Sequence, residues 1–261
     1  MNIDKFSITS WDVMSGFNRG TGNLDFVVDE LTDFTLGQTQ EDTPITGKGG
    51  RQISTLKKNK AVNGSGTNGM LSGGLLAAQV GTDVEDGEYD IRYTDVIIVN
   101  GNEGETLETA IGTAGNEIGT IYVRDENQVY ISGGTKLTQT AGEPTKGTFS
   151  YDPATKKIKF SAGEVADGVE VIAIYNVKKS GKKITNDAEH YSQVLELIID
   201  VTCQDACDNV FHGQFLVDRA DFSGEFDLSG GSDPSTHAFS FTSLPNVCTG
   251  KTKLWDFIVF D

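Results

Sequence analysis

The fold class is decided by residues 147–177, which read GTFSYDPATKKIKFSAGEVADGVEVIAIYNV. Runs of alternating apolar and polar residues at 147–151 and 158–160 flank the turn sequence DPAT. A second turn at Asp167-Gly168 precedes a long, mostly apolar run at 169–177. Alternation of this kind, bounded by Asp, Pro and Gly, is typical of β-strands joined by turns. We therefore predict a β-sheet in this stretch.

Residues upstream continue the same pattern, so the predicted β module covers residues 87–177. Several short strands separated by turns indicate a β-sandwich or a small barrel. We expect an immunoglobulin-like β-sandwich, inserted into a second domain. Its further strand candidates are Tyr89–Tyr93, Val96–Asn100, Ile118–Arg124 and Gln128–Ile131.

Both ends of the chain are also β-like. Near the start, alternation from Phe6 to Val13 slips by one residue after Ile8. Next, Leu24, Phe26 and Val28 share one face of a strand, and a turn at Thr32-Asp33 leads to Phe34–Leu36. This pattern predicts an antiparallel hairpin with one dry face.

The last third alternates in the same way, with Leu195, Leu197, Ile199 and Val201 on one face. We predict one β-sandwich or barrel domain built from residues 1–86 and 178–261, with residues 87–177 inserted. Its later strand candidates are Phe211–Val217, Asp221–Leu228, His237–Phe241 and Leu254–Asp261.

Residues 37–69 are polar and rich in glycine, which predicts a long exposed loop. Loops of that length within a compact domain usually have a function or are disordered. The next residues, Met70–Val80, are the best helix candidate, although two internal glycines weaken it. The predicted fold is thus mainly β with one short helix.

The chain has 31 glycines, 5 prolines and a formal net charge of −17. Such an acidic surface repels phosphate, which argues against binding to a nucleic-acid backbone. Two interpretations of the charge stay open: solubility, or a wall along which a polyanion slides. Lysines cluster at 57–60, 156–157 and 178–183, where they would suit contacts between subunits, although a solvated surface is the commoner explanation of such clusters. We expect no membrane span and no export signal, because no apolar run has the required length.

Sequence motifs for nucleotide binding and catalysis are incomplete or absent. Gly250-Lys251-Thr252 resembles the end of a phosphate-binding loop, but Pro245 stands where its first glycine should be. Gly64, Gly66 and Gly69 fit G-x-G-x-x-G without a preceding strand, so a dinucleotide site is not expected. No serine lies in a G-x-S-x-G turn. We predict that the chain is not an enzyme and has no catalytic residues and no cofactor.

One group of residues has spacing that suggests a metal: Cys203, Cys207, His212 and Cys248. A structural zinc site would need all four to converge. The second C-x₂₋₄-C half of a zinc pattern is absent, so we favour reduced thiols that fill gaps in a β core. We predict no metal site. Trp11 and Trp255 lie within strand patterns, where a core role is expected.

Three stretches resemble the major tail and tail tube proteins of tailed bacteriophages. The first comprises GNLDFVVDELTDFTL at 22–36 and GKGGRQISTLKKNKAVNGSGTNGMLSGGLLAAQVG at 47–81. The second is the stretch at 147–177 quoted above, and the third runs from Gln214 to Asp261. In that family, a strand carrying a phrase like G-x-F-D-L precedes a polar turn and a final pair of strands. Here that phrase is Gly224-Glu225-Phe226-Asp227-Leu228.

The resemblance implies a structural function. Such proteins form hexameric rings that stack, through a long loop and terminal segments, into a tube for DNA passage. Residues 37–69 would be the stacking loop. The implied partners are other copies of the chain, other tail proteins of the virion, and DNA that passes without specific binding. The implied location is the virion, assembled in the host cytoplasm. Two alternatives stay open: a capsid decoration or head-fibre protein, and a carbohydrate-binding β-sandwich adhesin.

Overall fold

The computed structural model describes residues 5–124, 135–228, 234–247, 250 and 252–260. The chain forms two compact units. Unit 1 consists of residues 1–85 and 183–261, and unit 2 of residues 86–182. The described residues are mostly in β-strands, so the expectation of a mainly β chain with one short helix is confirmed.

The helix, α1, spans Gly73–Val80 and starts later than predicted. Ser72 is its N-cap, and the Ser72 Oγ atom accepts a hydrogen bond from the Leu75 backbone N–H at 3.4 Å. It ends where Gly81 adopts a φ of +79° and donates its N–H to the Ala77 carbonyl.

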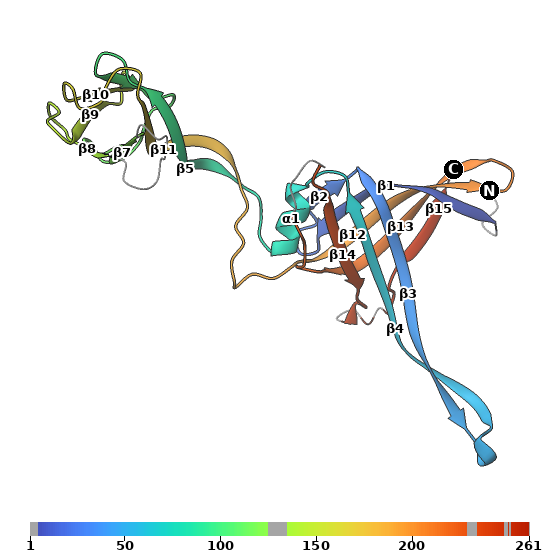
Figure 1. Cartoon of the computed structure of the whole chain (residues 1–261). Coiled ribbons are helices and arrows are strands. Elements are labelled where there is room, and N and C mark those ends of the chain that lie inside the picture. The colour runs from blue at the N-terminus through green and yellow to red at the C-terminus, as the bar shows by residue number, and fades with distance from the viewer. Residues whose placement is uncertain (1–4, 125–134, 229–233, 248–249, 251, 261) are drawn as a thin grey trace. The chain divides into compact units, whose positions relative to one another are not determined.

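The strands of unit 1 form one curled sheet (Figure 1). Its strand order is β2 (Leu24–Val28), β1 (Phe6–Asn18), β12 (Val194–Asp205), β13 (Val210–Phe222), β14 (His237–Ser243), β4 (Gln52–Asn68) and β3 (Leu31–Thr46), and β15 (Asp256–Phe260) also pairs with β13. Strands β2 and β3 lie at opposite ends of this order, yet only Asp29 and Glu30 separate them in sequence. The sheet must therefore curl into a half-barrel to bring its ends together.

The hairpin predicted for residues 24–36 is wrong, because β2 pairs with β1 and β3 pairs with β4. Alternation identifies the buried face of a strand but not its partner. The slip expected after Ile8 is a real irregularity of register in β1. The strand predicted at Asp221–Leu228 is also wrong beyond Phe222, where β13 ends.

Several glycines of unit 1 lie directly opposite an aromatic residue on the next strand. The pairs are Gly16 with Phe26, Gly64 with Phe241, and Gly66 with Phe239. A Cβ atom on Gly64 would lie 2.2 Å from the Phe241 Cζ atom, so only glycine leaves room for that ring. These glycines therefore serve the core and not a turn.

The exposed loop predicted at 37–69 is also wrong, because glycines such as Gly64 and Gly66 lie in a strand and not in a turn. The segment belongs to a long antiparallel hairpin, β3 and β4, whose outer part projects beyond the other strands of unit 1 (Figure 1). A tight turn around the short 3₁₀ segment Lys48–Gly50 joins the two strands. Threonine and isoleucine, which favour strands, outweigh the glycines there.

The core of unit 1 is rich in aromatic rings. Trp11 lies 4.5 Å from Phe34 and 5.6 Å from Phe215, measured between ring centroids. The core role expected of Trp11 agrees with this packing. Trp255 differs, since it is 37% exposed and meets Phe215 in an edge-to-face contact.

Unit 2 has a second curled sheet. Its order is β5 (Glu85–Ile98), β11 (Glu170–Lys183), β7 (Thr120–Val123), β8 (Lys136–Gln139), β9 (Thr148–Asp152), β10 (Lys157–Phe160) and β6 (Glu103–Glu105). The strands predicted at 89–93 and 96–100 form the single strand β5. The one predicted at Gln128–Ile131 lies outside the described residues. The short strands β6 and β8 were not predicted.

A buried polar network holds the loop after β6. Asp95 is 3% exposed, and its Oδ2 atom accepts hydrogen bonds from the Leu107 N–H at 2.7 Å and the Tyr175 hydroxyl at 2.9 Å. Tyr175 in turn accepts the Glu108 N–H at 3.3 Å. The pKa of Tyr175 is raised, mainly by burial. The hydroxyl therefore remains protonated and can donate to Asp95.

We expect Asp95→Ala to lower the free energy of unfolding of unit 2 by about 1–3 kcal/mol, since it leaves the buried Tyr175 hydroxyl and the Leu107 N–H without their acceptor. Hydrogen exchange at the buried Ile121 amide reports on this unit. Asp90→Ala, an exposed change on the same strand, is the control and should leave exchange unchanged. Equal protection in the two variants would show that the network adds nothing to stability.

Candidate functional site

Four strands of unit 1 form an antiparallel block, in the order β1, β12, β13, β15. One face of the block is dry. On β12, the side chains of Leu195, Leu197, Ile199 and Val201 are at most 1% exposed. Packed against that face are Phe6 and Phe257, whose rings stack at 5.8 Å.

The opposite face of the block is acidic, and we call it the acidic face. Strand alternation and register place Glu196, Asp200 and Asp256 on it, together with the apolar Ile198 and Leu216. Asp12 and Asp218 lie at register irregularities and are tied to this face by a hydrogen bond from Thr202 and an ion pair with Lys253, respectively. The Thr202 hydroxyl donates to Asp12 at 2.7 Å, and the Gln214 amide donates to Asp200 at 2.8 Å. These bonds fix two carboxylates at the surface.

Lys253 partly balances the charge of the acidic face. Its Nζ atom lies 2.7 Å from Asp256 and 2.9 Å from Asp218. The hydrogen bond to Asp256 is the first cause of the raised pKa of Lys253, followed by the bond to Asp218. One lysine shared by two carboxylates leaves the five-carboxylate face negative.

Both outer edges of the block lack a partner in the described part of the chain. Strand β2 pairs only with residues 14–17 of β1, which leaves the earlier part of β1 open on that side. At the other end, β15 pairs with β13 along one side only. The edge of β2 itself is covered by α1, because a Cβ on Gly74 would lie 2.6 Å from the Asp25 carbonyl. The block thus has two open edges.

The outer part of the β3–β4 hairpin, residues 37–61, forms a projection that we call the arm. It carries Lys48, Arg51, Lys57, Lys58 and Lys60 against Glu41 and Asp42. Five cations and two carboxylates give +3, so the rest of the chain, whose total is −17, carries −20. The arm also exposes Ile45, Ile53 and Leu56 by 45–64%.

The other two lysine clusters have partners within the chain. The ion pairs are Lys157–Glu103, Lys179–Glu108, Lys182–Asp86 and Lys183–Glu85. Exposed pairs of this kind stabilise a fold only slightly. In the arm, Lys58 is likewise paired with Glu41 at 3.1 Å, whereas Lys48, Arg51, Lys57 and Lys60 form no ion pair with the described residues. The arm therefore keeps a net positive charge for contacts with another subunit.

The structure does not bring together the three metal candidates that it describes, Cys203, Cys207 and His212. Cys203 is fully buried and lies opposite Phe211, so His212, the next residue on β13, points to the other face. Cys207 is exposed, and Cys248 lies outside the described residues. Burial, followed by the Asp12 charge, raises the pKa of Cys203. Cys203 therefore acts as a small apolar core residue, as the sequence predicted.

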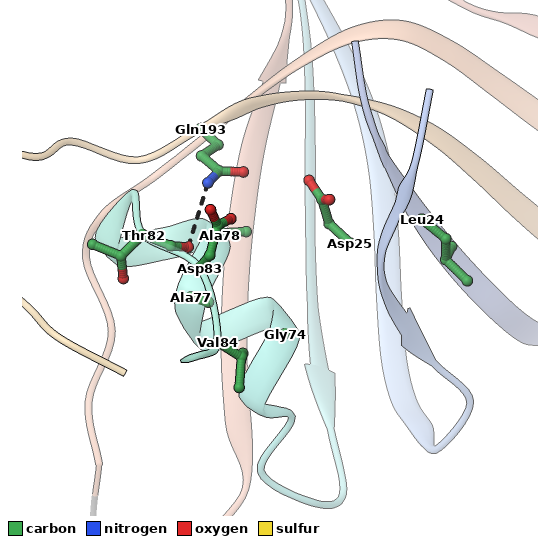
Figure 2. A pocket seen from close by; sticks show the side chains of 9 residues that line it. All are labelled: Leu24, Asp25, Gly74, Ala77, Ala78, Thr82, Asp83, Val84 and Gln193. Carbon is green, nitrogen blue, oxygen red and sulfur yellow. Dashed lines mark hydrogen bonds between the residues drawn. The ribbon is translucent and has the colours of Figure 1, made fainter. Parts of the chain in front are cut away.

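A small cavity of about 220 Å³ lies between α1 and β2 (Figure 2). Asp25, Asp83 and Gln193 are among the residues that line it, and the Gln193 amide donates to the Thr82 carbonyl at 3.4 Å. Burial, followed by the Asp83 charge, raises the pKa of Asp25. The described lining residues include no histidine, cysteine or lysine.

No helix in the described ranges is long and apolar enough to cross a membrane.

Comparison with known proteins identifies the chain. A search of curated proteins found no match. Residues 14–255 match the model of the YomU/Tube protein family, and this range includes all of unit 2 and most of unit 1. The chain therefore belongs to the YomU/Tube protein family, a phage-derived family of structural tail tube proteins.

Proposed function

We propose that this protein is the subunit of a phage tail tube, in which copies join edge to edge into rings and the rings stack into a channel for DNA. The observation that carries the proposal is the four-stranded block with two open edges and an acidic face. Family membership supports the same function.

The open edges are suited to joining copies. Each strand of the block is antiparallel to the next, so β1 and β15 run in opposite directions. The β15 edge of one copy therefore meets the β1 edge of the next in antiparallel pairing. Such a head-to-tail contact closes into a ring when the rotation between copies allows it. The ring satisfies edges that would otherwise promote aggregation.

The acidic face would line the channel. The dry face of each block already packs on the core of its own subunit, so the acidic face is the one that remains for the lumen. Carboxylates such as Glu196 and Asp200 repel the phosphates of DNA, so the wall would not bind the DNA backbone. DNA would then pass along the wall without specific binding.

The arm would connect one ring to the next. Its net charge of +3 is complementary to the acidic remainder of a second copy. A contact with another copy would bury its exposed Ile45, Ile53 and Leu56, which is favourable for apolar side chains. Partners are thus further copies and other tail proteins, in a virion component assembled in the host cytoplasm.

Cross-linking tests the edge contact. We replace Ser10 on β1 and Ile258 on β15 by cysteine, in a background with Cys207→Ser and Cys248→Ser, and add a short thiol cross-linker. The double variant should give a ladder of covalent multimers, because each copy contributes one edge of each kind.

The control pair is Ser10→Cys with Glu196→Cys, since Glu196 lies within the block and not at its edge. Because this pair has a cysteine at only one of the two edges, successive copies cannot be cross-linked into a ladder, and we expect no multimer beyond a dimer. If both variants gave only the monomer band at high protein concentration, the proposed edge contact would be wrong.

A further inference from the structure

A buried polar cluster joins the start of β14 to the helix. His237 is fully buried, Gln79 is 1% exposed and Asn68 is 4% exposed. Asn68 and His237 lie opposite each other on β4 and β14, whereas Gln79 lies on α1. Burying three such side chains is costly unless they are hydrogen-bonded to one another or to the backbone.

The hydrogen bonds fix which nitrogen of His237 carries the proton. The Gln79 amide nitrogen donates to the Ala238 carbonyl at 3.3 Å, which turns the Gln79 Oε1 atom toward the ring. That oxygen lies 2.7 Å from His237 Nε2, so Nε2 must donate. Nδ1 accepts the backbone N–H of Ser72 at 3.3 Å. The neutral ring with its proton on Nε2 satisfies both contacts.

Only neutral groups hold the ring in the described structure. Ser72 and Gln79 are hydrogen-bonded to it from the N-cap and the helix. Asn68 lies opposite it on β4, with its amide hydrogen-bonded to the Met70 carbonyl. No carboxylate or ammonium group contributes to its electrostatics there, and burial alone lowers the pKa of His237. A positive charge on the ring would have no counter-charge among these partners.

We propose that His237 makes the seating of α1 pH-sensitive, by holding the N-cap residue Ser72 only while the ring is neutral. Protonation places a hydrogen on Nδ1, where the Ser72 N–H already points, so two donors would face each other. The contact breaks, and the first turn of α1 loosens. Since α1 covers the edge of β2, acid would also expose that edge. This inference does not depend on the proposed tube.

The direction of the effect follows from linkage. Histidine in an unfolded segment has a pKa of about 6.5, and the folded pKa is lower. The open state therefore binds more protons below about pH 6.5, and the contact loses stability as the pH falls. For an opening that exposes His237, the open fraction should rise from pH 7.5 to pH 5.0, by at most about 30-fold, the limit for a ring that stays neutral in the folded state.

Hydrogen exchange of the Leu75, Leu76 and Ala77 amides tests this inference, after correction for the intrinsic rate at each pH. His237→Gln should remove the pH dependence, because the glutamine amide can accept from Ser72 and donate to Gln79 but cannot be protonated. His212→Gln, on the exposed side of β13, should respond to pH as the unchanged protein does. The same acid response in His237→Gln would overturn the proposal.

Should His237→Gln fail to fold, nitrogen NMR of the unchanged protein decides the question. The proposal requires the Nε2–H form and no titration of His237 near pH 6.5. An Nδ1–H ring, or an ordinary titration near pH 6.5, would contradict it.

Discussion

Replacing Gly64 with valine is expected to lower the free energy of unfolding of unit 1 by about 3 kcal/mol. The new Cβ would lie 2.2 Å from the Phe241 Cζ atom. Phe241 is only 2% exposed, and its ring lies 5.7 Å from the Phe222 ring and 6.3 Å from the Phe34 ring, measured between centroids. Because these rings surround it, Phe241 cannot move aside without disturbing the core.

Gly37→Val is the matched control, because it lies in the same hairpin, on β3. A Cβ at Gly37 meets no atom closer than the Asn63 carbonyl at 3.9 Å. Urea unfolding followed by tryptophan fluorescence reports on unit 1, since Trp11 and Trp255 both belong to it. We expect a change within about 0.5 kcal/mol for the control. Equal stability of the two variants would contradict the close approach at Gly64.

Strand alternation predicted much of the fold. The Leu195–Val201 pattern gave β12, the aromatic C-terminus gave β15, and the turn at 152–155 gave β9 and β10. Alternation failed where pairing mattered, because Leu24–Val28 pairs with a strand before it and not with the one after it. Local sequence contains no record of which distant strand fills the neighbouring position.

Glycine was the most misleading residue. Gly64 and Gly66 look like turn residues in sequence, but each leaves space for a phenylalanine from β14, which follows about 170 residues later. Only the three-dimensional register reveals that role. For this reason a paired hairpin was predicted as a loop.

The candidate site was only partly visible in the sequence. Glu196 and Asp200 alternate with the core residues of β12, so two of the five carboxylates of the acidic face could have been predicted from that strand alone. The open edges could not, because they depend on β2 pairing with only part of β1 and on β15 pairing with β13 along one side only. The separation of Cys203 from His212 likewise required the register of β12 and β13.

Shortening the arm is expected to stop rings from stacking while the rings still form. Residues 40–60 are replaced by Asn-Gly, which joins Thr39 to Ala61 through a two-residue turn. Thr39 and Ala61 already face each other in the hairpin, so the remaining register is kept. The change removes the basic charge and the exposed Ile45, Ile53 and Leu56. Core residues such as Phe34 and Val62 stay in place.

A second variant separates charge from shape. Lys57→Glu, Lys58→Glu and Lys60→Glu together reverse the basic character of the arm, whereas arginine at the same three positions preserves it. We expect short or absent tubes from the glutamate variant and normal tubes from the arginine variant. Tubes of equal length from both would show that the charge of the arm has no part in stacking.

Electron microscopy of the purified full-length protein, beside the arm-shortened variant, tests the central claim most directly. We predict stacked rings with a central channel for the full-length protein and isolated rings for the shortened one. Full-length protein that stays monomeric at every concentration, or that forms particles without a channel, would contradict the account and favour a decoration protein or an adhesin.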